Sequence, residues 1–212
     1  MTKEITTKTA QENFWAGEFG DNYISRNNSS SLLQSNIDFF KKSLRKCEPL
    51  TQVLELGCNI GMNLKAMSTL MPGTQFTGVD VNAKAVQTAR ETLEANIFEA
   101  TIIQPLAFQQ QFDLVFTKTV LIHIHPEHLK DVYENLFSLS SRYVLIAEYY
   151  NPSPVEVEYR GHKERLFKRD FAGELIDKYP LQLIDYGFVY KRDPHAPQDD
   201  INWFLFEKCE TI

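Results

Sequence analysis

The sequence predicts an α/β protein built on a doubly wound, mostly parallel seven-stranded sheet, with an antiparallel C-terminal hairpin and a helical N-terminal arm. Two observations support this prediction. From residue 51 onward, short apolar strands alternate with helical segments of about 10–15 residues. The last two apolar runs, 181–190 and 201–208, have no helix between them, so we expect them to pair antiparallel.

Length, composition and charge narrow the class of protein and the partners to be expected. The chain has 212 residues, of which 43% are hydrophobic and 24% charged, so we expect one globular domain over 1–212. Its parts would be a helical arm and cap over 1–48 and the core over 49–212. The net charge of −6, from 22 basic and 28 acidic residues, argues against nucleic-acid or membrane partners.

The sequence also predicts the cellular compartment of the protein and the state of its cysteines. We find no apolar run of about 18 residues and no signal-peptide core, so we expect a cytoplasmic protein. The three cysteines, Cys47, Cys58 and Cys209, are far apart and have no CxxC spacing. Neither a disulfide framework nor a zinc knuckle is therefore indicated.

The N-terminal arm is polar with interspersed aromatic residues, and we expect one or two short helices over 1–27. Serines 29–31 then offer N-caps for a helix that places Leu33, Ile37, Phe40 and Leu44 on one face.

The alternating part begins with a strand over 51–57, which ends in a glycine. A helical stripe of Ile60, Leu64, Met67 and Met71 follows and ends at Pro72-Gly73. The next strand covers 75–80, and Asn82 is the expected N-cap of the helix after it.

The remaining elements continue this alternation, with strands expected at 97–103, 112–117 and 142–150 and helices at 126–139 and near 169–179. In an open sheet of this kind, ligands bind at the carboxyl ends of the strands. The loops after residues 57, 80, 104, 117 and 149 are therefore the places to look for chemistry.

The strongest motif is VLELGCNIG at 53–61, where Gly57 and Gly61 let the backbone approach a ligand. Its spacing is GxxxG and not the GxGxxG that favours a dinucleotide. Glu55 would direct a carboxylate toward the site, which suits a cationic ligand. Taken alone, such a turn could also be purely structural.

Asp80 ends the second strand, 23 residues after Gly57. A carboxylate at this place can accept hydrogen bonds from both hydroxyls of a ribose. The alternative is a helix cap, but Asn82 already fills that role. The turn and Asp80 together favour a ligand of nucleoside type.

With these residues in place, the chain resembles the class I S-adenosylmethionine-dependent methyltransferases over about residues 50–208. The resemblance implies a Rossmann-like methyltransferase fold and S-adenosyl-L-methionine as cofactor. It assigns cofactor contacts to Glu55, Gly57, Cys58, Asn59, Gly61, Asp80, Val81, Gln104, Pro105, Leu106 and Thr117. Two departures are Asn59, where many members have glycine, and IIQPLAF at 102–108, which lacks a common acidic residue.

A narrower resemblance covers nearly the whole chain. The segments FWAGEFGDNYISRN, FDLVFTKTVLIHIHPEHL, YVLIAEYYNPSPVEVEYRGHKERLFKRDFAGELIDKYP and LIDYGFVYKRDPHAPQDDINWFLFEK are similar to the pseudaminic acid biosynthesis-associated methylases. This resemblance implies a small-molecule methyltransferase. It points only weakly to an acceptor, such as a nonulosonic acid.

Three residues of the arm are expected to close over the cofactor. Trp15 and Tyr23 would face the sulfonium, and Arg26 would pair with the carboxylate. The alternative is that the two aromatic residues pack the arm onto the sheet and Arg26 is solvated.

HIHPEH at 123–128 has two interpretations. It approximates the metal cluster of metallo-β-lactamase-like hydrolases, with His123, His125 and His128 as ligands. However, Pro126 and Glu127 more simply start a helix, so we expect no metal. As acid–base groups, His123 or His125 would lie beside the transferred methyl group.

The segment 148–170 is expected to be a long loop that forms a lid or an acceptor wall. The expected acceptor contacts are Tyr149, Tyr150, Tyr159, Arg160 and His162, the last also as an acid–base group. The alternative is a solvated loop with no role in binding the acceptor.

We therefore predict an O- or N-methyltransferase that acts on a small polar, anionic acceptor such as a nonulosonic acid, its nucleotide-activated form or a precursor. Two alternatives stay open: a catalytically silent cofactor-binding protein and the metal-dependent hydrolase. The oligomeric state is expected to be a monomer or a homodimer.

Overall fold

The computed structural model describes residues 8–24 and 29–209. A seven-stranded sheet forms its centre, in the order β3-β2-β1-β4-β5-β9-β8. The strands are β1 (Gln52–Leu56), β2 (Gln75–Asp80), β3 (Asn96–Glu99), β4 (Phe112–Lys118), β5 (Ser140–Glu148), β8 (Leu181–Val189) and β9 (Ile201–Lys208). The first five run parallel, and β9 is antiparallel to both β5 and β8, as the sequence predicts.

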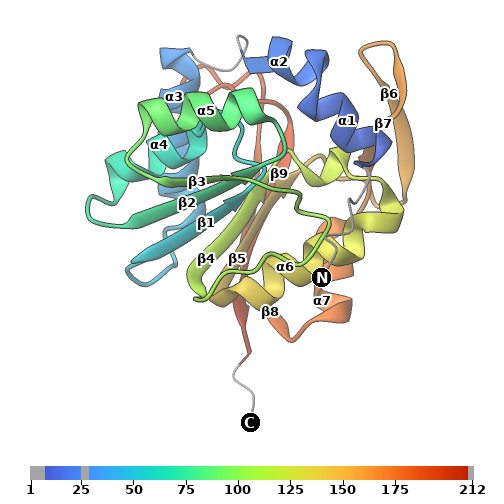
Figure 1. Cartoon of the computed structure of the whole chain (residues 1–212). Helices are drawn as coiled ribbons and strands as arrows, with labels where there is room; N and C mark the ends of the chain where they lie inside the picture. The colour runs from blue at the N-terminus through green and yellow to red at the C-terminus, as the bar shows by residue number, and fades with distance from the viewer. Residues whose placement is uncertain (1–7, 25–28, 210–212) are drawn as a thin grey trace, which may run out of the picture.

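Helices cover both faces of the sheet (Figure 1). One face carries α3 (Ser30–Ser43), α4 (Met62–Leu70) and α5 (Ala83–Thr92), and the other carries α6 (Leu129–Leu139) and α7 (Phe171–Lys178). Alternate side chains of each strand enter the two cores; on β5, for example, Val144 and Ile146 face α6, whereas Leu145 faces α3. The expected N-caps Ser29 and Asn82 both accept a backbone N–H of their helix.

The arm forms two short helices, α1 (Ala10–Ala16) and α2 (Glu18–Ile24). Thr9 and Glu12 start α1 with a reciprocal capping box. Figure 1 shows both helices above the carboxyl ends of the parallel strands, beside the hairpin of β6 and β7. The arm therefore lies over the edge of the sheet where ligands bind in this architecture.

The structure corrects the expected loop at 148–170. Residues Val155–Tyr159 and His162–Lys168 form a two-stranded antiparallel sheet, β6 and β7. Arg160 and Gly161 make its turn, with φ of 50° and 83°. Positive φ at both central residues matches the twist of a hairpin, and the alternation of Val155 and Val157 with glutamates is a strand pattern.

Other element ends also differ from the expected ones. The strand expected over 97–103 ends at Glu99, because its only neighbour β2 ends opposite it, at Asp80. Ile102 and Ile103 still enter the core, but from a loop. The helix expected from 126 begins with a 3-10 turn, Pro126–His128, after another at Leu121–His123. Strand β5 spans 140–148 instead of 142–150.

Within the described residues, we find no helix whose length and apolar character would suit a membrane crossing.

Candidate active site

A cavity of about 560 Å³ opens at the carboxyl ends of β1, β2 and β4. The size is typical of small-molecule sites. The loops after β1, β2, β3 and β4 line it, together with the arm, α3, the start of α4 and the connection from β8 to β9. It lies where the strand order reverses between β1 and β4, the point at which doubly wound sheets bind ligands.

The glycine turn after β1 forms one wall. The N–H groups of Gly57 and Cys58 both donate to the Val79 carbonyl of β2, at 2.8 and 3.0 Å. Gly57 has φ of 80°, and a Cβ there would lie 2.6 Å from the Val120 side chain. The backbone at Gly57 therefore stays close both to Val120 and to the cavity.

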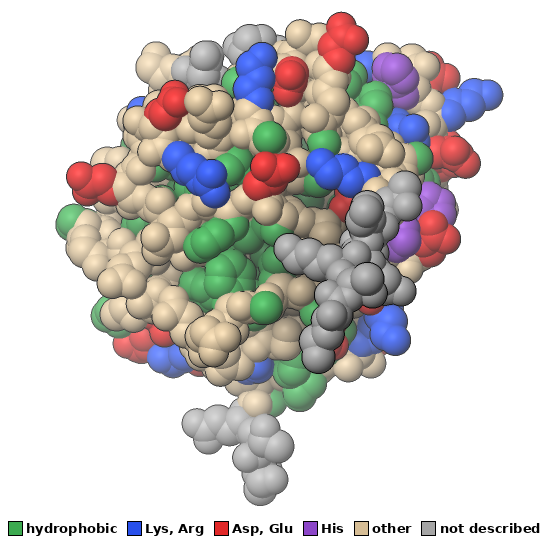
Figure 2. All heavy atoms as spheres, viewed as in Figure 1, with side chains coloured by type: hydrophobic (Ala, Val, Ile, Leu, Met, Phe, Trp, Pro, Cys, Tyr) green, Lys and Arg blue, Asp and Glu red, His purple; other side chains and the backbone are tan. Residues whose placement is uncertain are grey.

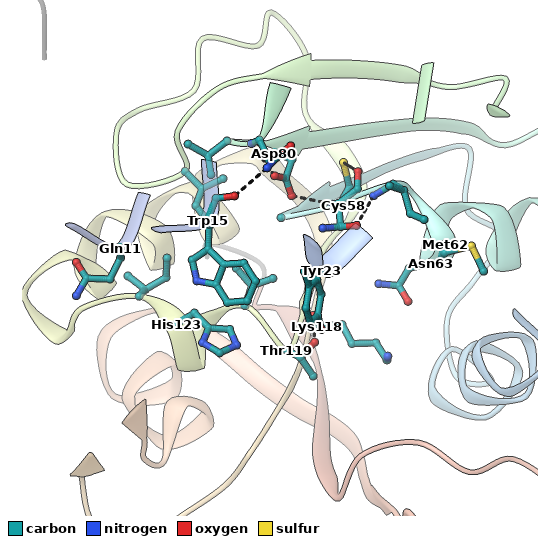
Figure 3. Close-up of a pocket in the computed structure, with 18 of the residues that line it drawn as sticks. Gln11, Trp15, Tyr23, Cys58, Met62, Asn63, Asp80, Lys118, Thr119 and His123 are labelled. Carbon is teal, nitrogen blue, oxygen red and sulfur yellow. Dashed lines mark hydrogen bonds between the residues drawn. The ribbon is translucent and has the colours of Figure 1, made fainter. Parts of the chain in front are cut away.

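Asp80 holds this turn and still faces the cavity (Figure 3). Its Oδ2 accepts the Asn59 N–H at 2.7 Å, and its Oδ1 accepts the Asn82 N–H at 2.9 Å. Burial raises the pKa of Asp80, against the lowering effect of these hydrogen bonds. Each carboxylate oxygen has a further lone pair, so the group can also accept ligand hydroxyls.

Glu55 is fully buried behind the turn and does not line the cavity, contrary to prediction. Its Oε1 accepts the Asn63 side-chain amide at 2.6 Å. Burial raises the pKa of Glu55 to about 8. Since desolvation disfavours the charged form, this group supports Asn63 and does not reach a ligand itself.

The end of β4 and the turn after it form a second wall of the cavity, with Lys118, Thr119 and Val120. Glu148, almost fully buried at the end of β5, accepts the N–H groups of Val120, Leu121 and Ile122 at 3.0, 3.0 and 3.4 Å. One carboxylate thus fixes three consecutive backbone amides. This anchor places Lys118 and Thr119 at the cavity.

His123 lines the cavity but is 8% exposed. Its Nδ1 lies 2.6 Å from the Arg165 carbonyl of β7, which makes Nδ1 the donor. Burial lowers the pKa of His123 to about 4. At neutral pH the imidazole is therefore uncharged.

His125 and His128 also line the cavity, and each lies near the same Glu127 oxygen, at 3.2 and 3.4 Å. Within 8–24 and 29–209, no group of three or more histidine, cysteine or acidic residues is arranged to hold a metal ion. The expectation of no metal site remains a prediction.

The arm supplies Trp15 and Tyr23, which both line the cavity and lie in its centre in Figure 3. The Trp15 ring contacts the rings of Tyr23 and His123 at centroid distances of 5.3 and 4.6 Å. The Trp15 carbonyl accepts the Asn82 side-chain amide at 2.9 Å, which ties the arm to the loop after β2. Arg26 lies outside the described residues.

The structure therefore brings together nine of the predicted site residues, which are Trp15, Tyr23, Gly57, Cys58, Asn59, Asp80, Val81, His123 and His125. Gly61 lies behind the turn, where it begins α4 with φ of 76°. Thr117 is fully buried in β4, because the strand continues to Lys118.

Other predicted residues do not line the cavity. Gln104, Pro105 and Leu106 come after the segment that does, which is Ala100, Thr101, Ile102 and Ile103. Early termination of β3 brings these earlier residues to the edge of the sheet. The predicted acceptor residues Tyr149, Tyr150, Tyr159, Arg160 and His162 are also absent from the lining. The first two come directly after β5, and the other three belong to the β6–β7 hairpin and its turn.

Several lining residues were not predicted, namely Gln11, Asn36, Asn63, Lys118, Thr119, Lys191, Gln198 and Asp199. Only Lys118 and Thr119 carry a sequence signal, since they follow directly on the strand 112–117. The others come from helices and a connection that reach the cavity only through the tertiary fold.

Comparison with known proteins finds similarity to methyltransferases over part of the chain. Residues 54–141 match the family model described as a methyltransferase domain. A ribosomal RNA small subunit methyltransferase C from Serratia proteamaculans is 34% identical over 91 residues, which is 42% of this chain and 24% of that protein. A tRNA (guanine-N(7)-)-methyltransferase from Chloroflexus aggregans is 35% identical over 104 residues, or 47% of this chain and 45% of that protein.

A solved structure resembles the whole fold. Magnesium protoporphyrin IX methyltransferase from Synechocystis PCC 6803 with bound SAH (S-adenosylhomocysteine) has a TM-score of 0.69 at 13% identity, and the match covers 93% of this chain and 97% of that one. Another structure of the same enzyme has bound SAM (S-adenosylmethionine).

The chain spans less than half the length of the curated relatives named above. The solved structures confirm the predicted Rossmann-like methyltransferase fold. Residues 54–141 thus match a methyltransferase domain, and the described chain around them has the fold of the solved methyltransferases that it resembles.

Proposed function

We propose that this protein transfers a methyl group from S-adenosylmethionine to an oxygen or nitrogen of a small polar acceptor. One observation carries the proposal: the glycine turn at Gly57 and the carboxylate of Asp80 line the same cavity as Trp15 and Tyr23. When bound, the cofactor supplies an electrophilic methyl group on a sulfonium sulfur.

The residues present fit this cofactor. Asp80 keeps free lone pairs for the ribose hydroxyls, and the close approach at Gly57 leaves backbone room for the methionine part. Val81, Ile102 and Ile103 offer an apolar surface for the adenine. Aromatic rings of the arm suit a sulfonium, because a cation is attracted to an aromatic face.

The acceptor side is enclosed and polar. Asn36, Gln198, Asp199 and Lys191 line it from α3 and from the connection between β8 and β9. The side chains of Asn36 and Gln198 are 2% and 9% exposed, and each has a buried oxygen without a partner among the described residues. Buried polar atoms of this kind favour an acceptor that carries hydroxyl or amino groups.

A nonulosonic acid of the pseudaminic type, its nucleotide-activated form or a precursor is our first candidate. It rests on the resemblance of the long segments 14–27, 112–129, 143–180 and 183–208 to the pseudaminic acid biosynthesis-associated methylases. Such a sugar acid also has the hydroxyl groups that the polar side of the cavity would bind. A cytoplasmic monomer or homodimer fits this role.

RNA is the second candidate, because the curated relatives are named for ribosomal RNA and tRNA. The net charge of −6 disfavours it, since nucleic-acid binding depends on basic side chains that neutralise phosphates. On the face shown in Figure 2, basic and acidic side chains are interspersed, which also disfavours a polyanion.

Calorimetry with SAH tests the cofactor site. Asp80→Ala should weaken binding by more than about 1.5 kcal/mol, because charge-assisted hydrogen bonds are lost. Glu99→Ala is the matched control, since Glu99 ends the adjacent strand but does not line this cavity. Equal affinity of the wild type and Asp80→Ala would contradict the proposal.

Radiolabel transfer tests the acceptor class. With [methyl-³H]S-adenosylmethionine, we expect label in a low-molecular-mass metabolite fraction and none in total RNA, with Asp80→Ala as background. Label in RNA would favour the second candidate. SAH binding without any transfer would favour a catalytically silent cofactor-binding protein.

A further inference from the structure

Lys118 is a cavity residue for which the cofactor site has no evident use. It ends β4, next to Thr119, and its side chain extends toward the part of the cavity bordered by Asn63 (Figure 3). Its Nζ lies 5.5 Å from the centroid of the Phe39 ring of α3. Its ammonium forms no hydrogen bond or ion pair with any residue in 8–24 or 29–209.

Three carboxylates from three different elements act electrostatically on this amine: Glu55 of β1, Asp199 of the β8–β9 connection and Glu148 of β5. Each already has a closer partner. Glu55 accepts from Asn63 at 2.6 Å, Glu148 accepts three backbone N–H groups, and Asp199 accepts the Tyr149 hydroxyl at 2.7 Å. The amine therefore has acidic neighbours but remains available to a ligand.

The pKa of the Lys118 amine supports proton exchange at this residue. Burial lowers the pKa of Lys118 to about 8, against the raising effect of Glu55, Asp199 and Glu148. About a tenth of the amine is then uncharged at pH 7, and about half at pH 8. His123 is the rival base, but with its pKa lowered to about 4 it is a much weaker proton acceptor.

We propose that Lys118 is the general base of the methyl transfer, acting on an acceptor whose nucleophilic oxygen or nitrogen carries a proton. This inference rests on the proposed function. The acceptor atom forms a bond to the methyl carbon, the electron pair of the broken carbon–sulfur bond stays on sulfur, and the acceptor proton passes to the Lys118 amine. The products are the methylated acceptor, neutral SAH and the Lys118 ammonium.

The first test needs no acceptor. Protein labelled with ¹³C-lysine is titrated by NMR, and the Lys118 signal is identified as the one missing from Lys118→Arg. It should titrate near pH 8, well below the ordinary lysine value of about 10.4. Titration of Lys118 together with the exposed lysines would overturn the proposal.

Calorimetry with SAH separates a base from a cofactor ligand. Lys118→Arg and Lys118→Met should keep SAH affinity within about threefold of the wild type, and a loss of more than about tenfold in both would overturn the proposal. Asp80→Ala losing affinity in the same assay shows that the cofactor assignment stands independently. Melting temperatures establish that each variant is folded.

Label transfer into the metabolite fraction completes the test. Both Lys118 variants should slow transfer by about 100-fold or more, the usual contribution of general-base catalysis, although Lys118→Arg keeps the positive charge. Added methylamine should partly restore transfer by the Lys118→Ala variant. Full transfer by Lys118→Arg would show that the charge, and not proton removal, is what matters.

Discussion

The tolerance of a residue to substitution and its charge state depend more on its surroundings than on its residue type. Gly57 and Gly73 both have positive φ, of 80° and 94°, but only Gly57 has a neighbour in the space where a Cβ would be. Glu55 and Asp113 are both carboxylates within a strand, β1 and β4. Burial raises the pKa of Glu55, whereas hydrogen bonds from Thr51 and Gln52 lower that of Asp113.

Gly57→Ala should therefore destabilise the protein more than Gly73→Ala. Both variants carry the strain of a left-handed backbone, which costs about 1–3 kcal/mol, but the methyl group at 57 would also displace Val120 from 2.6 Å. Urea denaturation measures the difference, and SAH calorimetry should show weaker binding for Gly57→Ala alone. Equal losses in the two variants would mean that the contact with Val120 is unimportant.

The buried carboxylates predict how stability depends on pH. The pKa of Glu55 is raised to about 8 and that of Glu148 to about 7, whereas an unfolded glutamate titrates near about 4.3. Between about pH 5 and pH 8 the folded chain therefore binds more protons than the unfolded chain. The free energy of unfolding should fall as the pH rises through this interval.

Glu55→Gln should flatten that slope, because its amide cannot titrate. Each such group contributes at most about 1.4 kcal/mol per pH unit. Urea denaturation at pH 5, 6, 7 and 8 provides the measurement. Asp113→Asn is the control, since a lowered pKa places its titration below this range and the variant should keep the wild-type slope. A wild-type free energy of unfolding that rises from pH 5 to pH 8 would contradict the raised pKa values of the buried Glu55 and Glu148.

At the scale of elements, the arm and the β6–β7 hairpin form one aromatic assembly beside the cavity. Phe14 and Phe19 of the arm contact His162 of the hairpin at centroid distances of 5.0 and 5.8 Å. The Gln11 side chain donates to the Glu164 carbonyl at 3.3 Å. The hairpin thus supports the arm, and the predicted acceptor residue His162 contributes through packing.

Trp15→Ala should reduce SAH affinity about tenfold or more, because the indole both lines the cavity and holds Tyr23 and His123. Arg160→Ala is the matched control: it lies at the exposed hairpin turn and should change neither SAH affinity nor methyl transfer. Calorimetry and label transfer measure both. Loss of transfer in Arg160→Ala would restore the acceptor role predicted from sequence.

At the scale of the whole molecule, the cavity combines segments from both ends of the chain. The arm covers it, the loops after β1, β2 and β4 form its walls, and the connection between β8 and β9 closes its polar side. The antiparallel placement of β9 brings Ile201 to the same edge as the carboxyl ends of the parallel strands. The polar side of the cavity therefore depends on the C-terminal hairpin of the sheet.

The purified protein should contain no stoichiometric zinc. His125 and His128 both lie beside Glu127, and the described residues offer no arrangement of three metal-binding side chains. Elemental analysis should find well below one zinc per chain, and a chelator should leave the melting temperature and methyl transfer unchanged. About one equivalent of tightly held zinc would instead support the metal-dependent hydrolase.

The sequence alone determined the order of strands and helices, the glycine turn and the carboxylate of Asp80. These features depend on the local hydrophobic period, on backbone freedom at Gly57 and on a cap at Asn82, and each of these signals is contained in a few consecutive residues. The alternation at 155–159 is an equally local signal for the hairpin, and the prediction of a loop over 148–170 is wrong there.

Only the tertiary structure decided which polar groups are buried and what they meet. Glu55 and Lys118 come together because β1 and β4 are adjacent, and His123 takes its donor role from Arg165, 42 residues away. Desolvation and hydrogen bonding between distant segments set their charge states, and a one-dimensional pattern contains neither.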